Sequence, residues 1–432
     1  MANFAQRKIA RESIEGTGTV VPDGLELPAE SVEGILAELA ENEKGINQHD
    51  SEGDVLTEDV TETEAQLDAV NEADEAAGDD AGDDAMDAEE DMPDEAAEAL
   101  DVAQESIRKR WGFEHRVSVA QEAYGSRKRR QVARESLWDD IKAFFRRMWE
   151  WLKEQGRKVK DRWLKFSNQG KSIQKRSKQY AEAIKNLGKL KSGKEELKGG
   201  FIKSLSVGGK FIGDNPAELK KELDMAEGFQ KDQAKLLEGA AEMVASMEKN
   251  IGEARSTGKE GFGTAASLEY TAMERDMRAM ATEGESLGGL TGKIVVEGTG
   301  EDISVTASAV ESEKGVPDEV KVPSASTLGA VNTFYGNLGK EIEKMVQGYH
   351  ATNQKREKYE KGIENVLKRI DALKVDDVDK DIGKVVRTGR RLISNTQSVL
   401  ATCERLASSV VKNAVSGLNT YISAGIACYD KK

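Results

Sequence analysis

The sequence predicts a mainly α-helical protein, in which a disordered acidic N-terminal segment precedes an elongated helical bundle with one short β-hairpin. Three observations support this fold class. Apolar residues recur every three or four positions over most of residues 326–418, which is the period of an amphipathic helix. Aromatic residues make up only 5% of the chain, which indicates a thin core spread along a rod. The net charge also inverts between residues 105 and 134.

The first 105 residues form a strongly acidic segment. They hold 33 acidic and 4 basic side chains, a net charge of −29, whereas the whole chain carries −16, so residues 106–432 carry +13. Residues 50–101 consist largely of Asp, Glu and Ala and contain no aromatic residue. Such a segment buries too little apolar surface to offset the entropy lost on ordering. We therefore expect it to be disordered, with short helices at most near residues 32–39 and 95–102.

A basic linker with candidate cleavage sites is expected at residues 106–135, followed by a basic amphipathic helical region at residues 136–222. The second range holds 22 basic and 11 acidic side chains. Ser136 is suited to cap its first helix, with Asp139 three residues later. Five apolar residues recur at the spacing of one helical face: Trp138, Ile141, Phe145, Met148 and Leu152.

The remainder, residues 223–432, is expected to form an elongated helical body. Asn215 followed by Pro216 is a typical helix start, and this helix is expected to run to about residue 250, with another near residues 265–282. Alternating apolar residues around Gly298 and Gly300 predict a β-hairpin near 293–308.

Two long helices are expected at the C-terminal end, joined by a turn near residues 374–379. Each would have about 45 residues and a length of roughly 65–70 Å. Their apolar stripes consist of Leu328, Val331, Tyr335, Leu338, Ile342, Met345, Tyr359, Ile363, Val366 and Ile370 in the first helix, and Ile382, Val385, Leu392, Val399, Cys403, Leu406, Val410 and Leu418 in the second.

Catalysis finds little support in the sequence. His49, His115 and His350 lie in unrelated contexts, and none has a second ligand at the spacing of a metal motif. Residues 170–172 resemble the end of a phosphate-binding loop, but Lys165 stands where its first glycine is required. We therefore expect no enzyme, no catalytic or cofactor-binding residue, no cofactor and no metal. The two cysteines cannot form a disulfide framework, and no run approaches the roughly 18 apolar residues of a membrane span.

A short motif occurs four times: Ala, then Gln or Arg, then Glu, then a small residue. Three of the copies fall within residues 103–136, where the charge inverts. A protease needs an extended and accessible backbone, so copies in a linker indicate proteolytic processing. The alternative is helix-favouring composition combined with duplication. The residues after which the chain would be cut are Glu12, Glu105, Glu122 and Glu135.

This layout resembles the internal head (inner body) proteins of phiKZ-like giant tailed phages. In that family a maturation protease removes an N-terminal propeptide in the prohead, cutting after a small residue, any residue and then Glu. The resemblance covers about the first 135 residues and, more loosely, the helix after Ser136, and nothing in residues 223–432 is typical of the family. It implies a structural protein of the capsid interior, assembled in the host cytoplasm. The tripeptides that fit the pattern are Ala10-Arg11-Glu12, Ala103-Gln104-Glu105, Ala120-Gln121-Glu122 and Ala133-Arg134-Glu135.

The charges indicate how an acidic and a basic piece would act in such a protein. In cis, the acidic segment would weaken binding of the basic region to nucleic acid until it is cut away, and residues 136–432 would then keep a net charge of +7. Contacts of Lys and Arg with phosphates are salt-dependent and independent of base sequence, and no base-reading motif is present. The candidate nucleic-acid contacts are Arg127, Lys128, Arg129, Arg130, Arg146, Arg147, Arg157 and Lys158.

The expected partners are the phage maturation protease, other capsid-interior proteins, packaged DNA bound by non-specific electrostatics, and a second copy bound through the C-terminal helices. Two alternatives remain open at this point. One is an ejected host-modifying or DNA-protection protein. The other is a cellular helical adaptor with an acidic disordered tail.

Overall fold

The computed structural model describes residues 32–76, 94–113, 126–257, 269–312, 314–374 and 380–432. The helices in these ranges are α2 (Val32–Ala76), α3 (Asp94–Trp111), α4 (Ser126–Lys185), α5 (Phe201–Ser204), α6 (Pro216–Thr257), α7 (Thr271–Ala279), α8 (Ala325–Asp371) and α9 (Lys380–Ala427), with a 3-10 turn at Gly300–Asp302. The strands are β1 (Leu187–Leu190), β2 (Glu196–Leu197), β3 (Ser206–Val207), β4 (Lys210–Phe211), β5 (Thr282–Ser286), β6 (Leu290–Glu297), β7 (Ser304–Glu311), β8 (Val320–Lys321) and β9 (Tyr429–Lys431).

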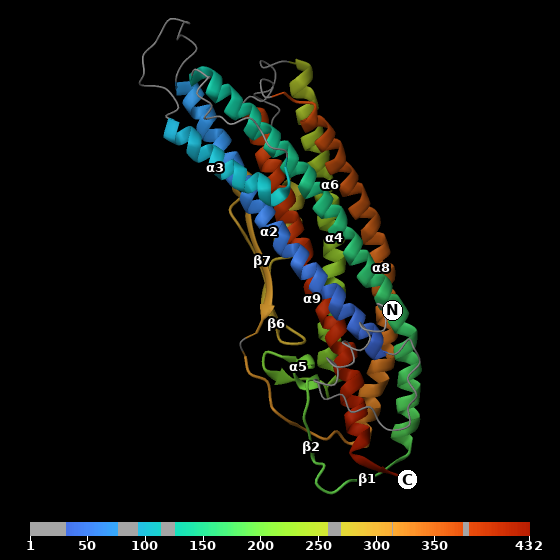
Figure 1. Cartoon of the computed structure of the whole chain (residues 1–432). Helices are drawn as coiled ribbons and strands as arrows, with labels where there is room; N and C mark the ends of the chain where they lie inside the picture. The colour runs from blue at the N-terminus through green and yellow to red at the C-terminus, as the bar shows by residue number, and fades with distance from the viewer. Residues whose placement is uncertain (1–31, 77–93, 114–125, 258–268, 313, 375–379) are drawn as a thin grey trace, which may run out of the picture.

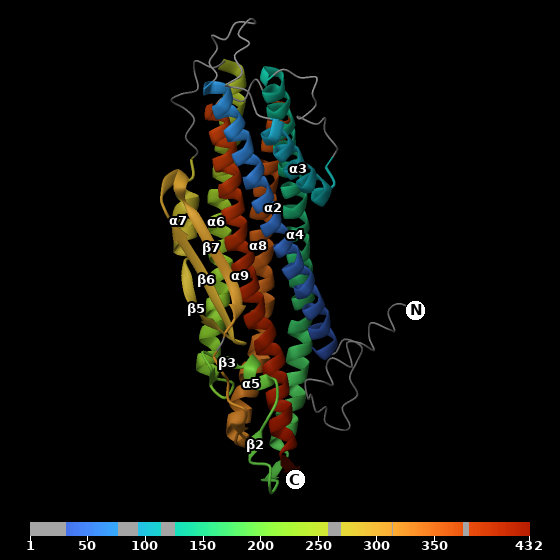
Figure 2. The same ribbon diagram turned by 60° about the vertical axis from the view of Figure 1, so that its left-hand side comes forward.

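Four long helices form an elongated bundle (Figure 1). α4 packs on α8, α8 on α6 and α6 on α9, while α4 and α9 touch each other only sparsely. α2 contacts both α4 and α9 and lies along the side where those two helices separate (Figure 2). The groove between α4 and α9 is therefore filled by the acidic N-terminal helix, which completes the bundle.

The two long C-terminal helices are confirmed. α8 has 47 residues and α9 has 48, and α8 ends at Asp371 while α9 begins at Lys380. Every residue of the two predicted apolar stripes is buried. At 1.5 Å of rise per residue these helices are about 70 Å long, so the core is a long column rather than a compact centre.

The predicted hairpin is confirmed and extended by a third strand. β6 and β7 pair antiparallel from Leu290 opposite Glu311 to Glu297 opposite Ser304, and β5 adds to the other edge of β6. Gly298 and Gly300 take φ angles of 69° and 64°, which suit glycine, where the chain turns between β6 and β7. The helix expected near 265–282 is shorter, because α7 ends at Ala279 and the chain enters β5.

The start of α4 differs from the prediction. Ser136 was expected to cap this helix, but α4 begins at Ser126 and Ser136 lies inside it. The Ser136 hydroxyl instead accepts a hydrogen bond of 2.7 Å from Arg108 of α3. The predicted apolar face of this helix, from Trp138 to Leu152, is buried as expected.

The expectation of disorder in residues 50–101 is wrong for the part that the structure describes. Residues 50–76 belong to α2, and residues 94–101 belong to α3. Eight of the ten described buried positions of α2 follow the spacing 3, 4, 3, 4 over seven intervals, which is the pattern of a helix packed along one seam, and the other two are Asp59 and Glu64. Only five of these eight positions are apolar, so composition concealed the pattern. The seam consists of Ile46, His49, Gly53, Leu56, Val60, Thr63, Leu67 and Val70.

Buried polar side chains cross the bundle near its middle. Glu404 of α9 accepts hydrogen bonds from the Trp163 indole of α4 and, at 3.5 Å, from Gln233 of α6. Arg162 donates to the Ser408 hydroxyl at 2.6 Å, also between α4 and α9. Because buried polar groups lose much of their stabilisation when their partners are displaced, these contacts fix how far the long helices slide along one another.

α6 begins at Pro216, as the sequence predicts, and Asn215 caps its N-terminus. The Asn215 side-chain oxygen accepts from the Ala217 and Glu218 amides at 3.2 and 3.4 Å, and its amide donates to the Glu218 carboxylate at 3.1 Å. We predict that Asn215→Ala lowers the free energy of unfolding by about 1 kcal/mol through loss of this cap. Urea unfolding followed by circular dichroism measures the change. Asn337→Ala, at an exposed interior position of α8, is the control and should not destabilise the protein.

Candidate functional site: the interface between the acidic helices and the bundle

The most unusual feature of the fold is that an acidic helix fills a groove in a basic body. Leu56, Val60, Leu67 and Val70 of α2 belong to the same apolar cluster as side chains of α4 and α9. Full burial of an aliphatic side chain contributes about 1.5–3 kcal/mol, so these four residues supply a substantial part of the attachment. Three sets of polar contacts along α2 then fix the register in which it packs against the neighbouring helices.

The first polar contact joins the N-terminal half of α2 to α4. The His49 and Trp151 rings stack with centroids 5.3 Å apart. The Trp151 indole donates to the His49 carbonyl at 2.7 Å, and His49 Nε2 lies 3.0 Å from the Trp151 carbonyl, so each residue contacts the backbone of the other. Gly53 lies one turn further along, and a Cβ there would collide with the Trp151 ring. Glycine at this position therefore allows α2 and α4 to pack closely.

The second contact is centred on Asp59, whose carboxylate is buried. Arg110 of α3 donates to both of its oxygens at 2.7 and 2.8 Å, and the Trp111 indole donates at 2.6 Å. α3 is tied to α4 in turn, because Arg108 donates to Asp140 at 2.6 and 2.9 Å in a buried pair. α3 thus acts as a strap that joins α2 to α4.

The third contact joins α2 to α9. Arg390 donates to both oxygens of Glu64 at 2.7 Å, and both side chains are more than nine-tenths buried. One turn away on each helix, Arg387 pairs with Asp68. A buried arginine is tolerated only when a carboxylate with good geometry balances its charge. α9 therefore depends on the acidic helix, although the two are more than 300 residues apart in sequence.

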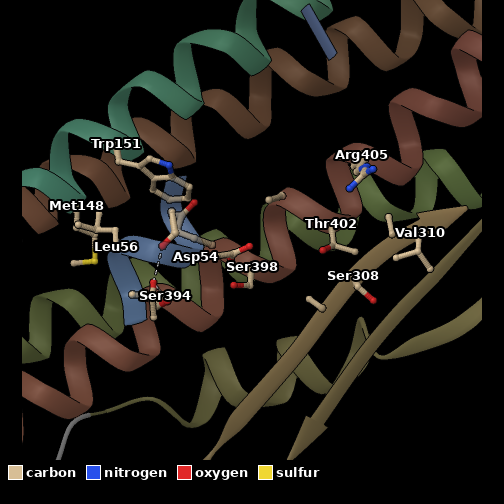
Figure 3. Close-up of a pocket in the computed structure, with 16 residues that line it drawn as sticks. Asp54, Leu56, Met148, Trp151, Ser308, Val310, Ser394, Ser398, Thr402 and Arg405 are labelled. Atoms are coloured by element: carbon tan, nitrogen blue, oxygen red, sulfur yellow. Dashed lines mark hydrogen bonds between the residues drawn. The ribbon is translucent and has the colours of Figure 1, made fainter. Parts of the chain in front are cut away.

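A cavity of about 220 Å³ lies where α2, α4, α9 and β7 meet. Figure 3 shows Trp151 and Asp54 at one end of it and Arg405 at the other, with hydroxyl-bearing residues of α9 between them. The Thr57 and Ser394 hydroxyls lie 3.2 Å apart and join α2 to α9 at this level. The cavity exists only while α2 is docked, because α2 forms one of its walls.

The structure locates two of the four candidate cleavage sites, while Glu12 and Glu122 fall outside the described residues. Glu105 is exposed on α3 and pairs with Lys109 at 2.8 Å. Glu135 is exposed on α4 and accepts from Gln131 at 3.2 Å, and the neighbouring Ala133 and Ser136 are buried. Both sites are therefore helical, which differs from the expected flexible linker at these positions.

Of the candidate nucleic-acid contacts whose side chains are described, Lys158 contacts the acidic helix α2, and the three arginines pair with carboxylates of α4 or α8. Arg146 pairs with Asp371 of α8 at 2.8 Å, and Arg147 pairs with Glu150 at 3.4 Å, both on the surface. Arg157 is exposed and pairs with Glu154, whereas Lys158 donates to the Gly45 carbonyl of α2 at 3.2 Å. The side chains of Arg127, Lys128, Arg129 and Arg130, at the start of α4, are not among those that the structure describes.

The residues that build this interface were missed in the sequence, although a signal was present. The seam of α2 has heptad spacing, and Arg387 and Arg390 interrupt the apolar stripe of α9 at positions that face neighbouring helices. Arginines on a buried stripe indicate that a carboxylate from another segment must reach them. The acidic N-terminal segment supplies these carboxylates, as Asp68 and Glu64.

No group of three or more His, Cys, Asp or Glu side chains in the described residues is placed to hold a metal ion. No helix among them has an apolar stretch long enough to cross a membrane.

The chain matches a known protein family over most of its length. The family model described as phiKZ-like phage internal head proteins matches residues 41–424. It therefore includes most of α2 and nearly all of the helical body, which is much more than the first 135 residues on which the resemblance rested. Neither the curated proteins nor the solved structures contain a match.

We predict that Gly53→Ala loosens α2, although the substitution favours an isolated helix. The added methyl group would collide with Trp151, so α2 should be cut faster by a broad-specificity protease. Gly45→Ala is the matched control, because its Cβ would meet nothing within 4 Å. It should slow proteolysis, since alanine favours a helix over glycine by about 1 kcal/mol. Equal behaviour of the two variants would contradict the close packing at Gly53.

We also predict that mild acid weakens this interface through His49. Burial lowers the pKa of His49. The charged groups beside it are Glu52, 3.6 Å from Nδ1, and Lys158. Because the proton binds more tightly when His49 is released, its contribution is complete above the ordinary pKa of about 6.5 and is lost as the pH falls below it. The melting temperature should fall more between pH 7.5 and 6.0 in the native protein than in His49→Gln, and equal losses would refute the role of His49.

Proposed function

The chain belongs to the phiKZ-like phage internal head proteins and so lies inside the phage capsid, and from this premise we propose that it is made as a precursor and packaged with DNA after cleavage. The family match over residues 41–424 is the observation that supports this proposal most directly. In this role the protein is structural and non-enzymatic. Its partners are the phage maturation protease, other capsid-interior proteins, packaged DNA, and a second copy bound through the C-terminal helices.

The positions of the helices support Glu122 as the first cleavage site. α3 ends at Trp111 and α4 begins at Ser126, and Glu122 falls in the interval between them. A protease binds its substrate as an extended strand, so cuts after Glu105 or Glu135 require a helix to open first. A cut after Glu122 separates the acidic helices from the body without breaking either helix.

The exposed arginines of α4 support contact with DNA. Arg146 and Arg157 are 11 residues apart, close to three full helical turns, and therefore share one side of α4. Their carboxylate partners are surface groups, and exposed pairs of this kind contribute only about 0–1 kcal/mol. The arginines can exchange these carboxylates for phosphates at little cost, which suits binding without base specificity.

One of the two earlier alternatives loses its support. The cellular adaptor rests on an acidic N-terminal tail that is disordered. In the structure, α2 of that segment packs against α4 and α9, and the family is a phage family. Ejection of the mature protein into the host is compatible with a capsid-interior location, but no feature of the described residues favours it.

We predict a new N-terminus at Ala123 in mature particles. Peptide mass spectrometry of purified virions, with chemical labelling of free α-amino groups, measures this directly. A variant with Glu122→Gln should shift the cut or slow it, whereas Glu105→Gln and Glu135→Gln should leave it in place. Mature particles that contain only the chain intact across residues 114–125 would contradict the proposal.

We further predict that the processed protein binds duplex DNA with a steep salt dependence. Arg146→Gln and Arg157→Gln should each reduce the slope of log K against log salt by about 0.9, since each removes one phosphate contact. Lys344→Gln, at an exposed ion pair on α8, is the charge-matched control and should leave the slope unchanged. Equal slopes for all variants would place DNA contact elsewhere.

A further inference from the structure

Non-covalent contacts alone can hold α2 on the bundle, as they hold a separate partner helix in a groove. The main contacts of α2 are side-chain and backbone contacts with α4, α9 and α3. The polar contacts of His49 and Asp68 are 19 residues apart, so the anchored length of the helix is about 28 Å. No part of this attachment uses the peptide bonds that join the acidic helices to α4.

The groove between α4 and α9 has the chemistry of a receptor for one class of partner. Its apolar floor accepts Leu56, Val60, Leu67 and Val70, which are anchors of the kind by which an amphipathic helix docks into a groove. Its charged rim presents Arg387 and Arg390, which pair with carboxylates of α2. A nucleic-acid backbone would satisfy the arginines but would leave the apolar floor exposed to water.

We propose that the α4–α9 groove is a binding site for an acidic amphipathic helix, and that it keeps α2 and α3 bound without a covalent link after the chain is cut between them and α4. This inference rests on the proposed function only in supposing that such a cut occurs in the phage. The occupant is the N-terminal piece of the chain itself. α3 remains attached to α2 in either state, because Arg110 and Trp111 of α3 both contact Asp59 of α2.

This site changes the order of events in maturation. A cut after Glu122 converts the acidic helices from a covalent segment into a bound subunit, and Arg387 and Arg390 stay covered. Release is a second step, in which the two ion pairs with α9, the Arg108–Asp140 pair between α3 and α4, and the apolar seam are lost together. Only then does the body gain two arginines beyond those already exposed on α4.

The test uses the full chain with the recognition sequence of an unrelated, sequence-specific protease inserted within residues 114–125. After complete cutting, the two pieces are passed through a size-exclusion column at micromolar concentration and moderate salt. The native pair should elute together. Separation of the native pieces would overturn the proposal.

Charge exchange across the groove tests its specificity. Arg390→Glu places a carboxylate against Glu64, so the cut pieces should separate, with at least a tenfold loss of affinity. Adding Glu64→Arg restores an opposite-charge pair and should restore co-elution. Lys344→Glu, on the surface of α8, is the control and should not affect the complex.

Either of two results would refute the assigned groove: co-elution of the Arg390→Glu pieces, or separation of the doubly exchanged pieces. The recovery of binding in the double variant distinguishes a failed interface from a failed fold. Because the cut is made by an unrelated protease on purified protein, the outcome does not depend on whether the viral protease cuts the chain or the body binds DNA.

Discussion

Arg390 lies in the buried face of α9, and the carboxylate that balances it comes from Glu64 of α2. Removing one partner of a buried ion pair costs about 3–5 kcal/mol, because the other charge is left without water or a counter-ion. The sequence of α9 therefore presupposes that the acidic helix is docked. The same dependence explains the arrangement of the bundle, in which α4 and α9 diverge and α2 fills the space between them (Figure 2).

The acidic segment has two separable properties. A few of its carboxylates, those of Asp59, Glu64 and Asp68, are used in specific contacts beside the apolar seam. The 33 acidic and 4 basic side chains together give the segment its net charge of −29. Docked α2 brings its own carboxylates close to the basic body, while Arg146 and Arg157 of α4 pair with Asp371 and Glu154 instead. On the proposed function, screening of DNA binding in the precursor would be a long-range electrostatic effect that weakens as salt increases.

The sequence was most informative where one period persisted over many turns. The apolar stripes of α8 and α9 were predicted closely, and so was the capped start of α6 at Asn215, because these depend on local spacing. Most of the turn predicted near residues 374–379 lies outside the described residues. The three-stranded sheet was only partly predicted, since β5 has no alternation of its own. α2 was missed because His49, Gly53 and Thr63 occupy seam positions, and the first two depend on Trp151 of a distant helix while the Thr63 hydroxyl donates to the Asp59 carbonyl within α2. Composition identified the acidic segment correctly but could not indicate that a groove was available to order it.

The central claim is that the acidic N-terminal helix is a docked part of the fold. Hydrogen–deuterium exchange of the intact chain tests this most directly. Amides in residues 46–70 should exchange as slowly as those in the middle of α9, since both belong to one packed unit. Exchange of residues 46–70 at the rate of an unstructured peptide, with α9 still protected, would contradict the docked interface and the processing scheme built on it.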